Sequence, residues 1–299
     1  MFITFDLIRS ILKKSILLKF IGLFSVIRFY NIVILAIAQL ICSVYFFSSG
    51  NDLYSVIFDK NVWFIIISTS TSISAGYIIN NFYDLDKDLI NRPLKTIIEE
   101  KVSIRTKMIV FIFLNFVCLI FAMLVSSRAF FFFLFYILSI LIYSVKISKF
   151  PFVGNLLSVL LSIMPFFAVT LYYKNFTQEI FFHAFYLFLV VMLKDLVKDL
   201  ISLRGDFTMN YKTITVVYGE KVTKFYMSLI GSLIIIVSLL IFNFFEISLM
   251  KYYYLFSIIH IIIFNIILWN KSDLINYQKL HNSVRFLIVL GLLSIPLHK

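Results

Sequence analysis

Nine apolar segments, each long enough or nearly long enough to cross a lipid bilayer, constrain this chain more than any other feature of its sequence. A membrane-spanning helix needs about 20 predominantly apolar residues, because its backbone polar groups must be hydrogen-bonded within the helix. We therefore predict an all-α, polytopic membrane protein. The predicted spans are about Phe29–Phe47, Val62–Asn80, Met108–Ser127, Ala129–Val145, Phe152–Tyr173, Ile180–Asp199, Phe225–Phe245, Tyr252–Trp269 and Val284–Leu297.

The composition supports this setting and excludes several classes of protein. Of the 299 residues, 62% are hydrophobic and only 14% are charged, which leaves too little polar surface for a soluble globule. The net charge of +12 does not indicate nucleic-acid binding, because the basic residues lie between the apolar segments and form no solvated face. Cys42 and Cys118 lie inside apolar segments, so neither a disulfide framework nor a metal–thiolate site is indicated.

Positive charges are distributed unequally between the two ends of the predicted helices. One end, together with the N-terminal segment, carries 22 of the 27 Lys and Arg residues. The other end carries Lys60, Arg128, Lys174, Lys251 and Lys299. Because loops rich in Lys and Arg normally remain in the cytoplasm, we predict an integral protein of the cytoplasmic (inner) membrane of a bacterium, with a cytoplasmic N-terminus.

The remaining segments are short. Residues 1–20 combine Arg and Lys with Phe, Ile and Leu, which predicts an amphipathic helix at the membrane interface. The longest connections are roughly 25 residues, too short for a separate soluble domain. We therefore expect residues 1–299 to form a single transmembrane domain.

Two clusters of acidic residues follow apolar segments on the predicted cytoplasmic side. In the first, Asn80, Asp84 and Asp88 recur at every fourth position and therefore share one face of a helix. The second cluster, near the end of another apolar segment, consists of Asp195, Asp199 and Asp206. Carboxylates this close repel one another unless a cation lies between them, and a divalent ion with oxygen ligands meets that need.

A diphosphate attached to an apolar chain fits both the charges and the membrane. Divalent ions bridge carboxylates to phosphate oxygens, while Lys and Arg neutralise the remaining charge. Loss of an allylic diphosphate leaves a carbocation, which aromatic faces stabilise electrostatically, and the chain contains 36 Phe and 17 Tyr. A polyprenyl diphosphate is therefore the predicted donor, with its apolar chain among the helices.

The residues around both clusters resemble the signatures of the UbiA family of intramembrane prenyltransferases. The family's first signature is matched in this chain by Asn80-x-x-x-Asp84-x-x-x-Asp88 followed by Asn91-Arg92-Pro93 and Lys95. The family's second signature is resembled in this chain by Val197-Lys198-Asp199-Leu200 through Arg204-Gly205-Asp206 to Tyr211-Lys212-Thr213 and Gly219. A softer pattern between them is matched by Tyr143-Ser144, Lys146, Lys149 and Gly154-Asn155. The resemblance implies nine helices around a central cavity, with the active site at the cytoplasmic face.

The resemblance also implies roles for individual residues. Mg²⁺ is expected to be held against the diphosphate by four aspartates, which are also the expected catalytic residues, and by one amide oxygen: Asp84, Asp88, Asp199, Asp206 and Asn80. Contacts to the diphosphate itself are expected from Asn80, Lys95, Lys146, Lys198, Arg204 and Lys212. A second tier of site residues comprises Asn81, Asp195 and Ser202.

Two positions within the acidic clusters depart from the family signatures, and Ile214 and Thr215 replace the usual Leu-Pro of the second signature's tail. Asn81 stands where the family usually has Asp, and Ser202 stands where many members have the first Asp of the second cluster. Each lost carboxylate weakens cation binding, so the number of bound ions stays open. His183, His260, His281 and His298 show no paired ligand spacing, and we interpret them as structural or interfacial.

The predicted activity is Mg²⁺-dependent transfer of a polyprenyl group to a membrane lipid or an aromatic acceptor. The string from Lys194 to Leu200, with Arg204-Gly205-Asp206, is similar to that of the geranylgeranylglycerol-phosphate geranylgeranyltransferase branch, which favours a glycerol-phosphate prenyl ether as acceptor. The alternative acceptor is a quinone-precursor aromatic acid of the 4-hydroxybenzoate or dihydroxynaphthoate type. A non-catalytic lipid-binding member and an ion-coupled transporter are the remaining alternatives.

Overall fold

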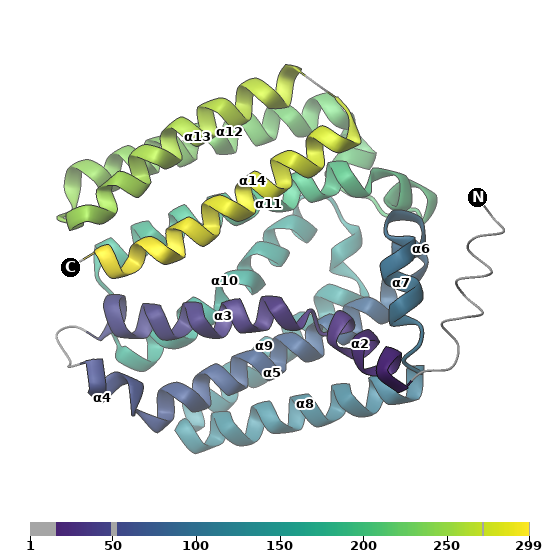
Figure 1. Cartoon of the computed structure of the whole chain (residues 1–299), viewed down its shortest axis with the longest axis horizontal. Helices are drawn as coiled ribbons and strands as arrows, with labels where there is room; N and C mark the ends of the chain where they lie inside the picture. The colour runs from purple at the N-terminus through teal and green to yellow at the C-terminus, as the bar shows by residue number, and fades with distance from the viewer. Residues whose placement is uncertain (1–15, 49–52, 271, 299) are drawn as a thin grey trace.

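The computed structural model describes residues 16–48, 53–270 and 272–298, and every regular element in these ranges is a helix (Figure 1). The predicted amphipathic helix of residues 1–20 falls largely outside the described residues. The elements are α2 (Ile16–Val26), α3 (Phe29–Cys42), η2 (Ser43–Phe47), α4 (Leu53–Ile57), α5 (Lys60–Tyr83), α6 (Leu85–Asn91), α7 (Pro93–Glu99), α8 (Ile104–Val125), α9 (Ser127–Val145), η3 (Ile147–Lys149), α10 (Val153–Tyr173), α11 (Gln178–Thr208), α12 (Ile214–Phe244), η4 (Ser248–Met250), α13 (Lys251–Asn270), α14 (Leu274–Ser294) and η5 (Ile295–Leu297).

Nine helical segments within the described ranges are long and apolar enough to cross a bilayer, which confirms the predicted fold. They are α3 with η2, α5, α8, α9, α10, α11, α12, η4 with α13, and α14 with η5. Helices α8 and α9 form a tight hairpin because Ser126 alone separates them. The Ser126 hydroxyl accepts a hydrogen bond from the backbone N–H of Ala129 and so caps α9.

The ninth span begins at Leu274, ten residues before the predicted start at Val284. Its first turns contain the polar residues Gln278, His281 and Asn282, which lowered the apparent hydropathy of this stretch. These three side chains are among those that line the large internal cavity.

Most of the residues in the two predicted polar connections, 81–107 and 200–224, are helical. The first contains α6 and α7, and the second contains the end of α11 and the start of α12. Within α12, Gly219 has φ 81° and ψ 171°, a conformation that glycine adopts without strain. The polar chemistry therefore lies largely on helices, which hold side chains more rigidly than loops do.

The spans pack as two halves (Figure 1). Helices α11 to α14 share one apolar core, which includes Leu193, Met227, Ile261 and Val284. Helices α5, α8, α9 and α10 share another, which includes Ile65, Cys118, Phe133 and Val169. In Figure 1, α6 and α7 lie at one end of the bundle, beside the end of α11. We call this the aspartate end, because Asp84, Asp88, Asp199 and Asp206 all lie there.

Candidate active site

A cavity of about 1250 Å³ lies between the two halves and matches the predicted central cavity. Aromatic and aliphatic side chains form much of its wall, among them Ile73, Tyr136, Tyr186 and Tyr253. Six basic side chains also line it, namely Arg28, Arg92, Lys95, Lys194, Lys198 and Arg285. Among the described residues, Asp195 is the single carboxylate in this lining. The large cavity is therefore apolar over much of its length and strongly basic where these residues gather.

A small polar cavity of about 50 Å³ adjoins the large one at the aspartate end. The two cavities share Asn80, Tyr143, Asp195 and Lys198 in their linings, together with Arg28, Arg92 and Ile201. Both acidic clusters line the small cavity, which is surrounded by Asn80, Asp84, Asp88, Asp195, Asp199 and Asp206. The fold thus brings together the two clusters that are far apart in the sequence, as the resemblance implied.

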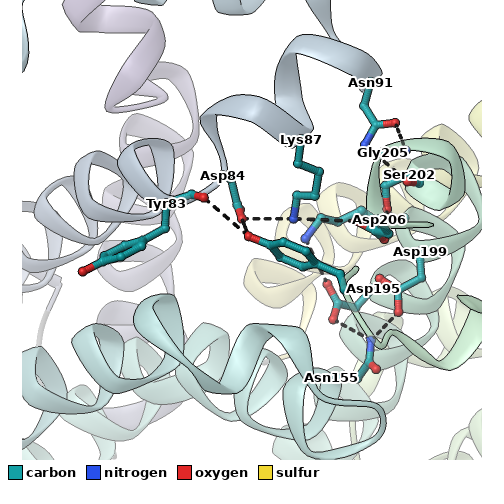
Figure 2. Close-up of polar contacts among 12 residues, drawn as sticks. Tyr83, Asp84, Lys87, Asn91, Asn155, Asp195, Asp199, Ser202, Gly205 and Asp206 are labelled. Atoms are coloured by element: carbon teal, nitrogen blue, oxygen red, sulfur yellow. Dashed lines mark hydrogen bonds and ion pairs between the residues drawn. The ribbon is translucent and has the colours of Figure 1, made fainter. Parts of the chain in front are cut away.

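Asp84 lies at the end of α5, where the backbone turns into α6, and its side chain is buried. Its Oδ1 atom accepts a hydrogen bond from the Tyr211 hydroxyl at 2.9 Å and lies 3.1 Å from Lys87 Nζ (Figure 2). Burial and the neighbouring Asp84 carboxylate raise the pKa of Tyr211, so this hydroxyl stays protonated as a donor. Asp84 is therefore held in one orientation at the edge of the small cavity.

Lys87 connects the two acidic clusters. Its Nζ atom lies 3.7 Å from Asp206 Oδ1 as well as close to Asp84, and it lies over the ring of Tyr211 at 4.3 Å from the centroid (Figure 2). Asp206 is only 2% exposed, and its Oδ2 atom accepts a hydrogen bond from the Ser202 hydroxyl at 2.8 Å. Its Oδ1 atom is buried and accepts no hydrogen bond from any described residue. One carboxylate oxygen of this cluster is thus available to a further cation.

Asn155 on α10 holds the other two aspartates of α11. Its side-chain amide nitrogen donates to Asp199 Oδ2 at 2.8 Å and lies 3.2 Å from Asp195 Oδ2 (Figure 2). Lys198 Nζ lies 3.9 Å from Asp195 Oδ1. These contacts orient two buried carboxylates from successive turns of one helix toward the same cavity.

Asn91 fastens α6 to α11. Its side-chain oxygen accepts a hydrogen bond from the backbone N–H of Gly205 at 3.1 Å, and its amide nitrogen donates to the Ser202 carbonyl at 3.3 Å (Figure 2). A Cβ atom at position 205 would lie 2.7 Å from Asn91 Cγ, so the contact requires glycine. This pair of hydrogen bonds sets the distance between the two acidic clusters.

The five basic residues predicted to contact diphosphate occupy different environments. Lys198 lines both cavities, and Lys95 lines the large one. Burial, and next the Arg28 guanidinium, lower the pKa of Lys95. The other three, Lys146, Arg204 and Lys212, are exposed and line neither cavity.

Asn81 lines neither cavity and belongs to a separate buried network. Its amide nitrogen donates to Glu99 Oε2 at 2.9 Å, and its side-chain oxygen accepts from Lys107 Nζ at 2.7 Å. Ser25 donates to the other Glu99 oxygen at 2.8 Å. The network joins α2, α5, α7 and α8 beside Lys95, whose Nζ lies 3.3 Å from Glu99 Oε1.

Several lining residues had no role assigned from the sequence. Lys87 and Asn155 contact the aspartates directly, yet a lysine in an acidic run and an asparagine before an apolar run carry little signal by themselves. The residues Arg28, Arg92, Lys194 and Arg285 come from four separate segments. Only the tertiary fold brings these four side chains to one cavity.

The residues of the small cavity fit Mg²⁺. The donors are carboxylate and amide oxygens, which are the ligands that this ion prefers, and they come from two helical segments that face each other. The buried Asp206 Oδ1 makes no hydrogen bond and has Lys87 Nζ 3.7 Å away, so it has acceptor capacity left for a metal ion. Asn80, Asp84, Asp88, Asp199 and Asp206 are the side chains that could hold it.

Comparison of the sequence with known families and proteins finds relatives over most of the chain. The profile of the UbiA prenyltransferase family matches residues 39–290. A digeranylgeranylglyceryl phosphate synthase from Thermococcus gammatolerans is 28% identical over 177 residues, which is 59% of this chain and 63% of that protein. One of the same description from Sulfurisphaera tokodaii is 26% identical over 199 residues, which is 66% of this chain and 68% of that protein. The match to the first of these relatives thus spans less than two thirds of its length.

Solved structures show the same fold. A structure of digeranylgeranylglyceryl phosphate synthase in membranes superposes with a TM-score of 0.70 at 17% identity and covers 94% of this chain and 98% of that one. A UbiA homolog from Archaeoglobus fulgidus, bound to GPP and Mg²⁺, gives a TM-score of 0.68 at 13% identity and covers 92% and 99% of the two chains.

Proposed function

Because this chain belongs to the UbiA prenyltransferase family, we propose that it transfers a polyprenyl group from a polyprenyl diphosphate to the free hydroxyl of a glycerol-phosphate prenyl ether. The proposed donor carries a C15 to C20 or longer chain. The proposed cofactor is Mg²⁺, held by Asn80, Asp84, Asp88, Asp199 and Asp206.

The two adjoining cavities match the two parts of such a donor. The small cavity gathers the carboxylates, and the large one offers an apolar wall to the prenyl chain. Lys198 and Arg92 line both cavities, so these two cations are available to the diphosphate beside the carboxylates. Bound Mg²⁺ would supply further positive charge to the diphosphate oxygens.

The reaction breaks the bond between the allylic carbon and the diphosphate oxygen, and the electron pair leaves with the diphosphate. The tyrosines along the large cavity, Tyr136, Tyr143 and Tyr186, present π systems that stabilise the resulting positive charge. The acceptor hydroxyl oxygen then forms the new ether bond to that carbon. Its proton would pass to Asp195, and this proposal is supported by the presence of the Asp195 carboxylate in the linings of both cavities.

The basic lining of the large cavity is the observation that supports a glycerol-phosphate acceptor. Apart from the cations assigned to the diphosphate, Arg28, Lys194 and Arg285 also line this cavity and favour an acceptor with a strongly anionic head group. A phosphate monoester has more negative charge than an aromatic carboxylate. The relatives described as digeranylgeranylglyceryl phosphate synthases support the same acceptor class. A glycerol phosphate that already carries prenyl chains would also partition into the membrane.

Lipid mass spectrometry of reconstituted protein tests the acceptor. The protein is incubated with geranylgeranyl diphosphate, Mg²⁺ and, in turn, geranylgeranylglycerol phosphate, 4-hydroxybenzoate and dihydroxynaphthoate. We expect the diether product and little or no prenylated aromatic. A prenylated aromatic with no glycerol ether would contradict this acceptor and leave the transferase proposal standing.

A variant of the basic lining sharpens this test. Lys194→Met removes one cation of the large cavity without touching the small one. We expect the KM for the glycerol-phosphate acceptor to rise by about tenfold, the scale of one lost charge-assisted hydrogen bond, with the KM for the donor nearly unchanged. Equal effects on the two substrates would argue against a role of Lys194 in acceptor binding.

A further inference from the structure

Three metal-ligating side chains meet near the end of the large cavity that is remote from the aspartates, and we propose that they bind a divalent transition-metal ion of the Zn²⁺ type. The three are Glu179, His183 and His298. His183 lines the large cavity, as does Asp195 twelve residues further along α11. At 1.5 Å per residue the two positions are roughly 18 Å apart along the helix, so this cluster is separate from the proposed Mg²⁺ site.

The backbone places the three side chains together. Glu179 and His183 lie four residues apart in the first turns of α11 and so share one face of the helix. His298 follows η5 and reaches the same face, with its Nε2 atom 2.6 Å from Glu179 Oε1. His183 Nε2 lies 3.8 Å from the same oxygen. One ligand atom from each residue can be chosen so that all three lie within 4.8 Å of one another.

The hydrogen bonds of the described residues leave two ring nitrogens of this cluster without a partner. His183 Nε2 and His298 Nδ1 are both buried and make no hydrogen bond. His298 Nε2, by contrast, is hydrogen-bonded to Glu179 Oε1, and a metal ion bound to this nitrogen would replace that bond. His183 itself is only 7% exposed, and its Nδ1 atom bonds to the Tyr254 hydroxyl. In the tautomer in which Nδ1 donates to Tyr254, the lone pair of Nε2 is directed toward the Glu179 carboxylate 3.8 Å away. A metal ion bound between them would use this tautomer.

The surroundings are those of a supported metal site. Tyr254 holds the second ring nitrogen of His183, as an outer partner does for a ligating histidine. The ring of Phe46 lies against both imidazoles, with centroids 4.8 Å from His183 and 5.2 Å from His298. This packing restrains the planes of the two imidazole rings.

The ligand set selects the class of ion. Two imidazoles and one carboxylate are typical of Zn²⁺, with bonds of about 2.0–2.2 Å, whereas Mg²⁺ prefers oxygen ligands alone. Tetrahedral binding at that bond length separates ligand atoms by about 3.4 Å. The observed separations of 2.6 and 3.8 Å from Glu179 Oε1 lie on either side of this value, and all three ligand atoms lie within 4.8 Å of one another, so metal binding requires the side chains to rotate toward a common centre. The bound ion would fasten the start of α11 to the segment that follows η5.

Metal analysis of the purified, detergent-solubilised chain tests the site. The protein is stripped with EDTA, incubated with ZnCl₂ in the presence of excess MgCl₂ to occupy the aspartates, and desalted. We expect about one zinc per chain by elemental mass spectrometry. X-ray absorption at the zinc edge should show scattering from two imidazole rings.

The variants separate metal binding from folding. His298→Gln keeps a side-chain donor toward Glu179 but removes the imidazole, and His183→Gln does the same at α11. Both should lose the zinc, whereas His260→Gln on α13, a half-buried histidine outside the cluster, should retain it. Zinc that is absent from the wild type, or retained equally in both cluster variants, or bound without imidazole scattering, would overturn the proposal.

Discussion

Asn81 and Ser202, which stand where the family signatures usually have Asp, each have a local partner whose negative charge would repel a carboxylate at that position. Asn81 donates to Glu99, and Ser202 donates to Asp206. An aspartate at either position would place a second negative charge beside a buried one. In this chain, therefore, Ser202 orients an aspartate of the site and Asn81 supports the adjacent helix α7. Lys87 has a comparable role, because it supplies the positive charge between Asp84 and Asp206.

We predict that Lys87→Met destabilises the protein most strongly when divalent ions are removed. Without the ammonium, two largely buried carboxylates lose their shared cation, which costs roughly 1–3 kcal/mol in the free energy of unfolding. Bound Mg²⁺ should restore much of this loss. Thermal unfolding in detergent with EDTA and with MgCl₂ measures both states. A variant as stable as the wild type in EDTA would show that Lys87 does not balance these charges.

At the scale of elements, α6 and α11 carry the two acidic clusters and must be held at a fixed distance. The Asn91 side chain makes this connection through two hydrogen bonds to the backbone of α11. Gly205 leaves the space that Asn91 occupies. The asparagine and the glycine each belong to a family signature, and the structure gives a packing reason for both that does not involve substrate contact.

Gly205→Ala should therefore reduce transfer while leaving the chain folded in the membrane. The new methyl group would collide with Asn91, so α6 must move away from α11 and the two clusters must separate. A displacement of about 1 Å is enough to lower the rate about 100-fold. Gly231→Ala is the matched control, since its Cβ would meet Asn265 between α12 and α13, far from the aspartates. Similar losses of activity in both variants would point to a general packing defect.

At the scale of the whole molecule, the sequence predicted the number of spans, the pairing of the two acidic clusters and the cavity between the helices. Hydropathy identifies a span by its apolar residues, and the first turns of α14 lie outside the predicted ninth span because they contain the polar, cavity-lining residues Gln278, His281 and Asn282. Spacing along the chain finds Asp84 and Asp88, but it cannot find Asn155 or Lys87, whose roles depend on tertiary contacts. Glu179 and His298 likewise meet only in the fold, so the four histidines carried no ligand pattern in the sequence.

The charge distribution makes a prediction for the orientation of the whole bundle. The aspartate end is expected in the cytoplasm, because 22 of the 27 Lys and Arg residues lie on that side of the predicted spans. Single cysteines at Lys101, between α7 and α8, and at Met209, after α11, should react with a membrane-impermeant maleimide only when the cytoplasmic side is accessible. A cysteine at Lys174, between α10 and α11, should show the opposite pattern. Labelling of Lys101→Cys from outside intact cells would reverse the proposed orientation.

A prenyl-transfer assay with radiolabelled donor tests most directly whether the two aspartate clusters act together on a prenyl diphosphate. The reconstituted protein is assayed with MgCl₂ and with EDTA, alongside Asp84→Ala, Asp199→Ala and the control Asp86→Ala, whose side chain is exposed and lines neither cavity. We expect activity that requires Mg²⁺, a loss of roughly 100-fold or more in the first two variants and little change in the control. Near wild-type transfer by Asp84→Ala or Asp199→Ala, or transfer that persists in EDTA, would contradict this account of the site.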